Sequence, residues 1–368
     1  MRIALLGTRG VPARYGGFET AVEEIGSRLA ARGHDVTVYC RSEDRSPEYL
    51  GMRRVVLPAV RLRSAETLTH TALSVVHQVR ERADVAIVFN AANAPLVPAL
   101  HSLGVPVAVH VDGLEWQRGK WGRLGRRYYL VAERAAVRWA DALIADAVGI
   151  QEYYRRRYGA ESHFLAYGAP VLTHPALYRL PQLGLEVGGY HLVVARLEPE
   201  NHVDLILRGY VASSAQQPLV VVGSAPYASG HIDELERIAA TDDRIRMLGA
   251  VWDQELLDAL YAGASCYLHG HSVGGTNPSL LRALGAGASV AAFDVDFNRE
   301  VVGDAGVYFA EDDDVTTILK QVEADPEAAR ARGDAGRLSV ARRYRWDDVA
   351  DGYEELCAGL FTGTAVRP

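Results

Sequence analysis

MRIALLGTRGVPARYGGFET, residues 1–20, joins an apolar run to a glycine-rich loop. Residues 3–6 are all apolar and predict a short buried strand, and the apolar residues between 21 and 29 recur at helical spacing. Glycines at positions 7, 10, 16 and 17 lie between these two segments. Glycine lets a backbone approach an anion closely, and the first turn of a helix offers free N–H groups and partial positive charge. The stretch therefore predicts an anion-binding turn, which is typical of nucleotide-binding enzymes.

The spacing of these glycines differs from that of dinucleotide-binding proteins, which is G-x-G-x-x-G followed by an acid about 20 residues later. Gly7 and Gly10 are three positions apart, and Gly16 and Gly17 follow a long insertion. The loop therefore disfavours a dehydrogenase. A tight turn that binds no ligand remains the alternative for the loop taken alone.

Bulk composition narrows the class of protein. The chain has 368 residues, which suggests two domains, and 49% of them are hydrophobic. Its formal net charge of −7 argues against nucleic acid as a partner. Three widely separated cysteines show neither metal-ligand spacing nor a disulfide framework, and no apolar run reaches the ~18 residues of a membrane span. A strand begins at the N-terminus, so no signal peptide is predicted and a cytoplasmic location is expected.

Strand-like apolar runs alternate with amphipathic segments in both halves of the chain, which indicates parallel sheets covered by helices. Residues 171–189 contain prolines and glycines without periodicity and are interpreted as a linker. We therefore expect an α/β protein with two doubly wound, Rossmann-like domains, 1–170 and 190–345, facing an interdomain cleft. A final helix, 346–360, is expected to pack back on the first domain.

Five motifs occur in an order that resembles one family. The combination is similar to that of retaining GT-B glycosyltransferases of family four, and within them to a rhamnosyltransferase-like branch. The motifs are GTRG (7–10), YGGFET (15–20), DGLEW (112–116), ARLEPEN (195–201) and GGTNPSLL (274–281). The resemblance implies that the N-terminal domain binds an acceptor and the C-terminal domain binds a nucleotide sugar. It also implies sugar transfer to a hydroxyl with retained anomeric configuration, no metal, and no cofactor besides the donor substrate.

Arg196 directly follows a predicted strand, and an arginine offers phosphate a rigid fork of donors. The resemblance implies that this arginine contacts the donor pyrophosphate and offsets charge on the leaving group; the alternative is a surface ion pair with Glu198 or Glu200. Asn201 stands where the family commonly has a lysine, so it supplies a hydrogen-bond donor without a charge.

The glycine loop at 274–277 precedes a helix opened by Pro278, so the N–H groups of Gly275 to Ser279 are predicted to bind phosphate, although a simply capped helix is the alternative. The resemblance implies glutamates at positions 274 and 282, the second of which binds the ribose hydroxyls of the donor. This chain has glycine and arginine at these positions. Arg282 cannot accept from ribose hydroxyls and is expected to contact a phosphate or solvent instead. The donor-side candidates are Gly16, Gly17, Arg196, Asn201, Gly274, Gly275, Thr276, Asn277, Ser279, Leu280, Arg282 and Glu300.

Asp112 falls where the resemblance implies an active-site histidine, and a carboxylate suits the positive charge of an oxocarbenium-like transition state. His110 is the second candidate, so the predicted catalytic residues are Asp112, His110 and Arg196. The alternatives are that Asp112 caps a turn with Gly113 and that His110 is a core residue.

Arg9, Arg14 and Glu19 are the acceptor-side candidates, because they surround the first glycine loop. Solvated loop arginines and a first-turn acid are the alternatives. Asp294 and Asp296 imitate a metal-binding D-x-D pair but are interpreted as loop residues, so no metal site is predicted.

Residues 117–139 carry many arginines and one acid, interleaved with aromatic residues. This segment is predicted either to rest on anionic lipid or to form an ordinary solvated helix face.

Together these features predict a retaining, metal-independent glycosyltransferase that moves a hexose or deoxyhexose, rhamnose first, from a dTDP- or UDP-linked donor. The expected acceptor is a lipid-linked saccharide of surface polysaccharide biosynthesis. One alternative is a natural-product glycosyltransferase with a soluble acceptor. Another is a non-catalytic protein that binds sugar nucleotides, a hypothesis supported by Asn201 and Arg282.

Overall fold

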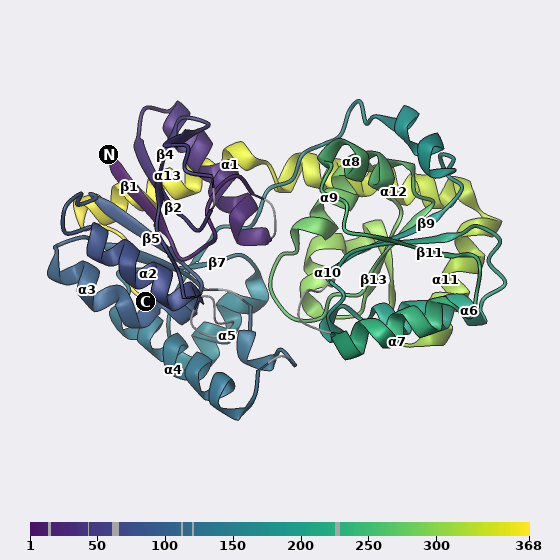
Figure 1. Cartoon of the computed structure of the whole chain (residues 1–368), viewed down its shortest axis with the longest axis horizontal. Helices are drawn as coiled ribbons and strands as arrows, with labels where there is room; N and C mark the ends of the chain where they lie inside the picture. Colours follow the sequence, from purple (N-terminus) through teal and green to yellow (C-terminus); the bar gives the residue numbers. More distant parts are fainter. Residues whose placement is uncertain (14–15, 43, 61–65, 112, 120, 225–228) are drawn as a thin grey trace. The chain divides into compact units, whose positions relative to one another are not determined.

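The computed structural model describes residues 1–13, 16–42, 44–60, 66–111, 113–119, 121–224 and 229–368. The chain divides into two compact units (Figure 1). Unit 1 comprises Met1–Tyr167 and Trp346–Pro368, and unit 2 comprises Gly168–Arg345. Each unit is built on a largely parallel sheet with helices packed on it, so the predicted α/β fold class is confirmed.

The sheet of unit 1 has the strand order β3-β4-β2-β1-β5-β6-β7-β8. All of its pairings are parallel except that of the short β3 with β4. The chain reverses its direction of winding between β1 and β5, so this is the switch point where ligands bind in doubly wound sheets. The strands are β1 (Arg2–Leu6), β2 (Asp35–Cys40), β3 (Glu48–Tyr49), β4 (Met52–Val56), β5 (Val85–Phe89), β6 (Val107–Val111), β7 (Ala142–Ala145) and β8 (His163–Phe164).

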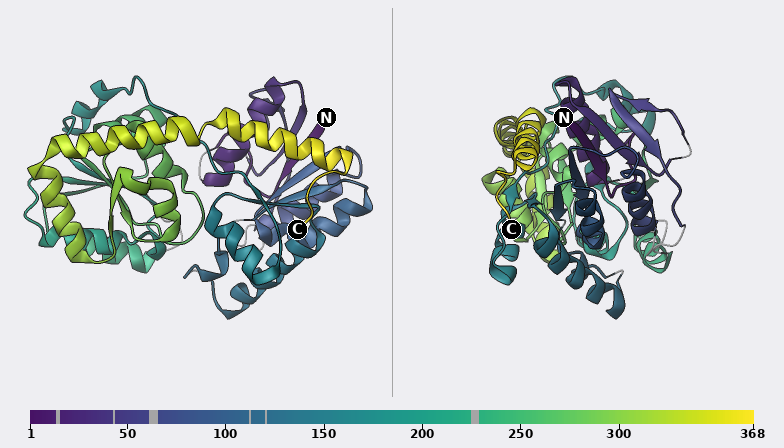
Figure 2. Two further views of the ribbon diagram at one scale, coloured as in Figure 1. Left: turned by 180° about the vertical axis from the view of Figure 1, so that it is seen from behind. Right: turned by 90° about the vertical axis from the view of Figure 1, so that its left-hand side faces the viewer.

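The helices of unit 1 present apolar residues to this sheet, as in α1, where Ala21, Val22, Ile25 and Leu29 are buried. Figure 2 shows the C-terminal helix α13 lying alongside α1, where Arg28 donates to Asp347 and Arg32 to Glu354. The helices are α1 (Gly17–Ala31), α2 (Glu66–His77), η1 (Ala91–Leu96), α3 (Val97–Ser102), η2 (Glu115–Gln117), α4 (Arg123–Trp139), α5 (Val148–Tyr158) and α13 (Trp346–Thr362).

The sheet of unit 2 has the order β11-β10-β9-β12-β13-β14, with parallel pairings throughout the described strands. Its switch point lies between β9 and β12. Every residue of β10 and of β12 is buried, as expected for strands covered on both faces. The strands are β9 (His191–Val194), β10 (Leu219–Val222), β11 (Ile245–Gly249), β12 (Cys266–His269), β13 (Val290–Phe293) and β14 (Gly306–Phe309).

Residues 171–189, interpreted from the sequence as a linker, lie in unit 2. They include η3 (Leu177–Leu183), whose Leu180 is fully buried, and the Gly188 N–H donates to the Gly263 carbonyl. The other helices of unit 2 are η4 (Pro199–Asn201), α6 (Val203–Ala212), α7 (Ser229–Ala239), α8 (Gln254–Gly263), α9 (Pro278–Ala286), α10 (Asp296–Val302), η5 (Gly303–Ala305), α11 (Asp312–Ala324) and α12 (Pro326–Arg343). In the described part of the chain, no helix combines the length and the apolar character needed to cross a bilayer.

Candidate functional site

Unit 2 gathers polar side chains at the carboxyl ends of β9, β12 and β13. Arg196 and Asn201 follow β9, His271 follows β12, and Asn298 belongs to α10 after β13. Because β9 and β12 meet at the switch point, these loops occupy the edge where ligands bind in such sheets. The structure thus brings most of the predicted donor-side residues to one end of one sheet.

The Asn201 amide joins two of these loops. Its Nδ2 donates to the Arg196 carbonyl at 2.7 Å, and its Oδ1 lies 2.7 Å from Nδ1 of His271. The carbonyl of Arg196 can only accept, so the amide orientation is fixed and Nδ1 of His271 must carry the hydrogen. Asn201 is 5% exposed. The donor that the sequence assigned to a ligand is therefore directed at the protein itself, and Asn201 positions Arg196.

The Arg196 side chain is 39% exposed, and its Nη1 lies 3.5 Å from Oε2 of Glu198. Among the described residues, Glu198 is its only ion-pair partner. The ion pair with Glu198, which the sequence offered as the alternative, is present, and the separation is too long for a strong hydrogen bond. The arginine thus keeps guanidinium donors available for an anion at the end of β9.

The N-terminus of α9 is capped by Asn277, whose Oδ1 accepts from the Ser279 N–H at 2.9 Å and from Ser279 Oγ at 2.8 Å. The Ser279 N–H predicted to bind phosphate is therefore already used, and the side chain of Leu280 is fully buried in the core. Gly274 has φ of +140°, which disfavours a side chain there, and Thr276 is 4% exposed. The capped-helix alternative accounts for Asn277 and Ser279.

Arg282 forms a two-pronged ion pair with Asp258 of α8. Its Nε lies 2.5 Å from Oδ1, and its Nη2 lies 2.9 Å from Oδ2. The side chains of the pair are 23% and 17% exposed. The sequence predicted that Arg282 contacts a phosphate or solvent. The structure shows instead that it pairs with the Asp258 carboxylate.

Residues after β13 stabilise the loop that contains His271. Asn298 is 3% exposed, and its Nδ2 donates to the carbonyls of His271 and Phe293 at 2.9 and 2.8 Å. Glu300 is half-buried, and its carbonyl accepts from Arg343. Asp294 of the D-x-D pair lies between β13 and α10, as a loop residue, and binds Arg299 through both carboxylate oxygens. Asp296, also interpreted as a loop residue, is instead the first residue of α10.

A buried polar cluster beneath this loop was not predicted. The Tyr267 hydroxyl lies 3.2 Å from both the Val194 carbonyl and Ser279 Oγ, and 3.1 Å from Nδ1 of His269. Burial lowers the pKa of His269 to about 3, so this ring is neutral at physiological pH. The HGH sequence at 269–271 is the signal that could have drawn attention to both histidines.

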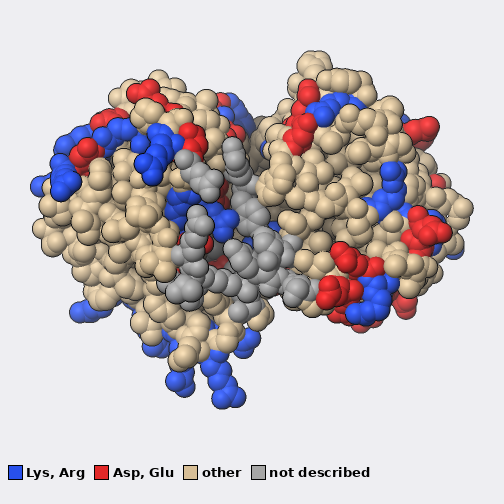
Figure 3. Space-filling model, in the orientation of Figure 1, with Lys and Arg blue, Asp and Glu red and all other residues tan. Residues whose placement is uncertain are grey.

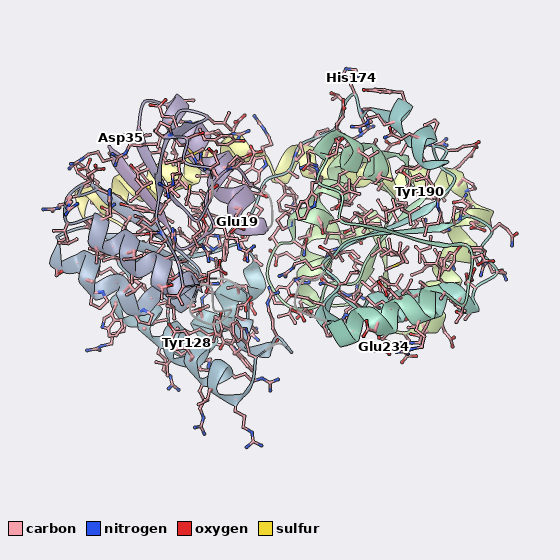
Figure 4. The ribbon with its side chains drawn as sticks, in the orientation of Figure 1. Glu19, Asp35, Tyr128, His174, Tyr190 and Glu234 are labelled. Atoms are coloured by element: carbon pink, nitrogen blue, oxygen red, sulfur yellow. The ribbon has the colours of Figure 1, made fainter. Side chains whose placement is uncertain are left out.

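In unit 1, Glu19 of α1 accepts a hydrogen bond from the Arg9 N–H at 2.9 Å. Figure 4 labels Glu19 at the beginning of α1. Gly16 and Gly17 form the start of this helix, and a Cβ at Gly16 would lie 2.6 Å from Oε2 of Glu19. Glu19 therefore links the glycine loop to α1, and Arg14 lies outside the described residues.

His110 of β6 is fully buried. Its ring stacks on Phe89 with centroids 5.4 Å apart and meets Phe18 edge-on at 5.1 Å. Burial lowers its pKa to about 3, and neither ring nitrogen has a hydrogen-bond partner among the described residues. These contacts favour the core interpretation of His110 as a neutral ring, and Asp112, the first catalytic candidate, lies outside the described residues.

The basic segment at 117–139 begins at the last residue of η2 and contains α4. Its acid, Glu133, points into the protein and accepts from the hydroxyls of Tyr153 and Tyr158 at 2.8 Å each, with a pKa raised by burial. Figure 3 shows basic side chains, with no acidic ones among them, projecting from the edge of unit 1 where α4 lies. The exposed residues of α4 are Arg123, Leu124, Arg126, Arg127, Val131, Arg134, Arg138 and Trp139.

Comparison with family models divides the chain in two. Residues 1–170 match a domain of unknown function, DUF1972, and residues 189–324 match the Glycosyl transferases group 1.

Two relatives are similar in sequence. O-antigen chain mannosyltransferase B of Escherichia coli is 29% identical over 170 residues, which are 44% of this chain and 43% of that protein. Alpha-maltose-1-phosphate synthase of Mycolicibacterium smegmatis is 26% identical over 384 aligned positions, covering 95% of this chain and 97% of that protein. The chain thus spans less than half of the first relative and nearly all of the second.

Two solved structures share the whole fold. Sucrose-phosphate synthase from Thermosynechococcus elongatus has a TM-score of 0.85 at 21% identity, covering 98% of this chain and 99% of that one. Anabaena HepE in complex with UDP-glucose has a TM-score of 0.81 at 18% identity, covering 97% and 100%. The fold is therefore GT-B, and with the group 1 domain and the named relatives the chain is a glycosyltransferase.

Proposed function

We propose that this glycosyltransferase binds a nucleoside-diphosphate sugar at the carboxyl end of the unit 2 sheet and transfers the sugar to a hydroxyl of a saccharide held by unit 1. The observation that carries the proposal is Arg196, which follows β9 inside the group 1 domain with its backbone fixed by Asn201. A uridine diphosphate donor is the first choice, because the structurally similar HepE was solved with UDP-glucose; dTDP is the second.

The chemistry proposed is metal-independent transfer with retained configuration by front-face displacement. The bond between the sugar and the diphosphate breaks while the acceptor oxygen attacks the same face, and the acceptor proton leaves toward the diphosphate. Negative charge grows on the departing diphosphate, where a fixed guanidinium stabilises the transition state more than the ground state. Arg196 supplies this charge, and Asp112 is proposed to line the reacting face.

The sugar is proposed to be a hexose or deoxyhexose, with rhamnose as the first choice from the motif resemblance. Mannose is the first substitute to try, because one relative is named a mannosyltransferase of the O-antigen chain. The same relative supports a saccharide acceptor of surface polysaccharide. A lipid-linked acceptor would place the enzyme at the inner membrane face, and the exposed arginines and apolar side chains of α4 suit such contact.

Donor binding and transfer can be tested in two steps. The first step is a thermal-shift screen against UDP, dTDP, GDP and their sugars. The nucleotides of one base should raise the melting temperature, since a ligand that binds only the folded state stabilises it. Donor hydrolysis and transfer are then measured for the wild type and for Arg196→Ala with that nucleotide sugar. Turnover should fall by at least about 100-fold in the variant, as it does in other enzymes when a hydrogen-bond donor to the transition state is removed. Unchanged turnover would refute the role of Arg196.

The ion pair of Arg282 with Asp258 favours one second candidate, a sugar-nucleotide-binding protein without transfer activity. Arg282 stands where the resemblance implies a glutamate that binds the ribose hydroxyls, and its pairing with Asp258 leaves that carboxylate unavailable for the role. Binding of a nucleotide sugar with neither hydrolysis nor transfer would support the second candidate over the first.

A further inference from the structure

A buried arginine that no motif singled out lies at the end of β2. The side chain of Arg41 is only 8% exposed, yet its Nη1 lies 3.6 Å from Oε1 of Glu66 and 3.5 Å from Oγ1 of Thr67. Its Nε is buried without a hydrogen-bond partner in the described part of the chain. A buried guanidinium normally forms close hydrogen bonds, because losing hydration without replacing it is costly. The donors of Arg41 are therefore largely unused.

A second arginine shares the same acid. Nη2 of Arg9 lies 4.0 Å from Oε2 of Glu66, while Arg41 faces the other carboxylate oxygen. The two loops are tied together, because the Arg41 N–H donates to the Arg9 carbonyl at 2.9 Å. Each oxygen of Glu66 thus faces a different guanidinium at a distance longer than a hydrogen bond.

The charges around Arg41 show how incompletely Glu66 balances this arginine. Burial lowers the pKa of Arg41, Glu66 raises it, the charge of Arg9 lowers it further, and Glu19 raises it. Glu19 is already engaged by the Arg9 N–H. The cluster therefore holds two converging guanidiniums whose shared carboxylate contacts neither at close range.

We propose that Arg41 and Arg9 bind a phosphate group of the acceptor, with Glu66 as an internal counterion that the phosphate displaces. This proposal rests on the proposed function and specifies its acceptor as phosphate-bearing. A phosphate dianion matches two guanidiniums better than one carboxylate does, because its oxygens accept from both forks at once. The place is also suitable: both residues follow parallel strands, β1 and β2, at the edge that carries the glycine loop.

The test is an isothermal titration of the full chain with inorganic pyrophosphate in saturating UDP. UDP fills the donor site, so any remaining binding reports a second phosphate site. Arg41→Gln should weaken pyrophosphate binding by about tenfold or more, and Glu66→Gln should strengthen it by about threefold or more, because it removes a competing charge. Arg53→Gln and Glu81→Gln are matched controls, since these residues form an exposed ion pair in the same unit and should leave binding unchanged.

Arg41→Gln and Glu66→Gln are expected to change pyrophosphate affinity in opposite directions, which distinguishes a binding site from a purely structural ion pair. If Glu66→Gln weakens binding as Arg41→Gln does, or if saturating UDP abolishes pyrophosphate binding to the wild type, the proposal is wrong. Should Arg41→Gln fail to fold, the direction of the Glu66→Gln effect decides alone. Failure of the wild type to bind any nucleotide would instead contradict the proposed function, so the two failures are distinguishable.

Discussion

Arg282 of α9 binds Asp258 of α8 through Nε and Nη2, at 2.5 and 2.9 Å. Both side chains are mostly buried, so each charge depends on the other for the interactions that water would otherwise supply. A planar guanidinium fork against a carboxylate is a strong ion-pair geometry. The pair therefore gives Arg282 a structural role independent of any nucleotide.

Removing one partner of this pair should destabilise the fold. We expect Asp258→Asn and Arg282→Gln each to lower the free energy of unfolding by about 1–3 kcal/mol, because each leaves an uncompensated, partly buried charge. The double variant should cost less than the sum, as urea denaturation and a double-mutant cycle would show. Additive losses would mean that the two side chains do not interact.

Asn201 should matter through Arg196. Replacing Asn201 with alanine removes the bond to the Arg196 carbonyl and leaves Nδ1 of His271 without its acceptor. We expect a loss of about 1–2 kcal/mol in the free energy of unfolding and weaker UDP binding. Calorimetry of Asn201→Ala beside Gln321→Ala, an exposed residue within α11, checks this. UDP affinity equal to that of the wild type would contradict a positioning role.

These contacts show where sequence reasoning succeeded and where it stopped. The strand β1, the start of α1 after Gly16 and the start of α9 at Asn277 and Pro278 depend on neighbouring residues, so local sequence patterns predicted them. The bond from Asn201 to His271 joins residues 70 positions apart, and no local pattern encodes it. Arg41 was missed for a similar reason: its partner Glu66 lies 25 positions away, and no sequence motif surrounds Arg41.

Buried histidines should make the stability of the fold depend on pH. The pKa values of His110 and His269 are about 3 in the folded state, below the ordinary value of 6.5. Between about pH 3 and 6.5 the unfolded chain binds more protons at these residues, so stability falls as pH falls, by up to about 1.4 kcal/mol per pH unit for each histidine. Urea denaturation of His110→Phe between pH 4 and 7 should show a shallower slope than the wild type. An equal slope in the variant would mean that His110 is not the buried neutral ring described.

The exposed face of α4 should bind anionic membranes. Arg123, Arg127 and Arg134 lie on one side of the helix because their spacing follows the helical repeat, and no described residue forms an ion pair with them. Each arginine near an anionic surface contributes about 1 kcal/mol, so replacing all three by glutamine should weaken binding to phosphatidylglycerol vesicles by about 100-fold. Co-sedimentation with vesicles at low and high salt measures the effect, and salt should weaken the binding of the wild type.

The matched control for this experiment lies on α5. Arg155 and Arg156 are paired with Glu161 and Glu152, and Arg157 lies over the rings of Tyr153 and Tyr158. Replacing these three arginines by glutamine removes the same charge from the same unit, but from positions that already have partners. If both triple variants lose vesicle binding equally, net charge rather than the α4 face is responsible. If the wild type binds no anionic vesicles at all, the alternative of a glycosyltransferase with a soluble acceptor is favoured, because a lipid-linked acceptor requires the enzyme to reach the membrane surface.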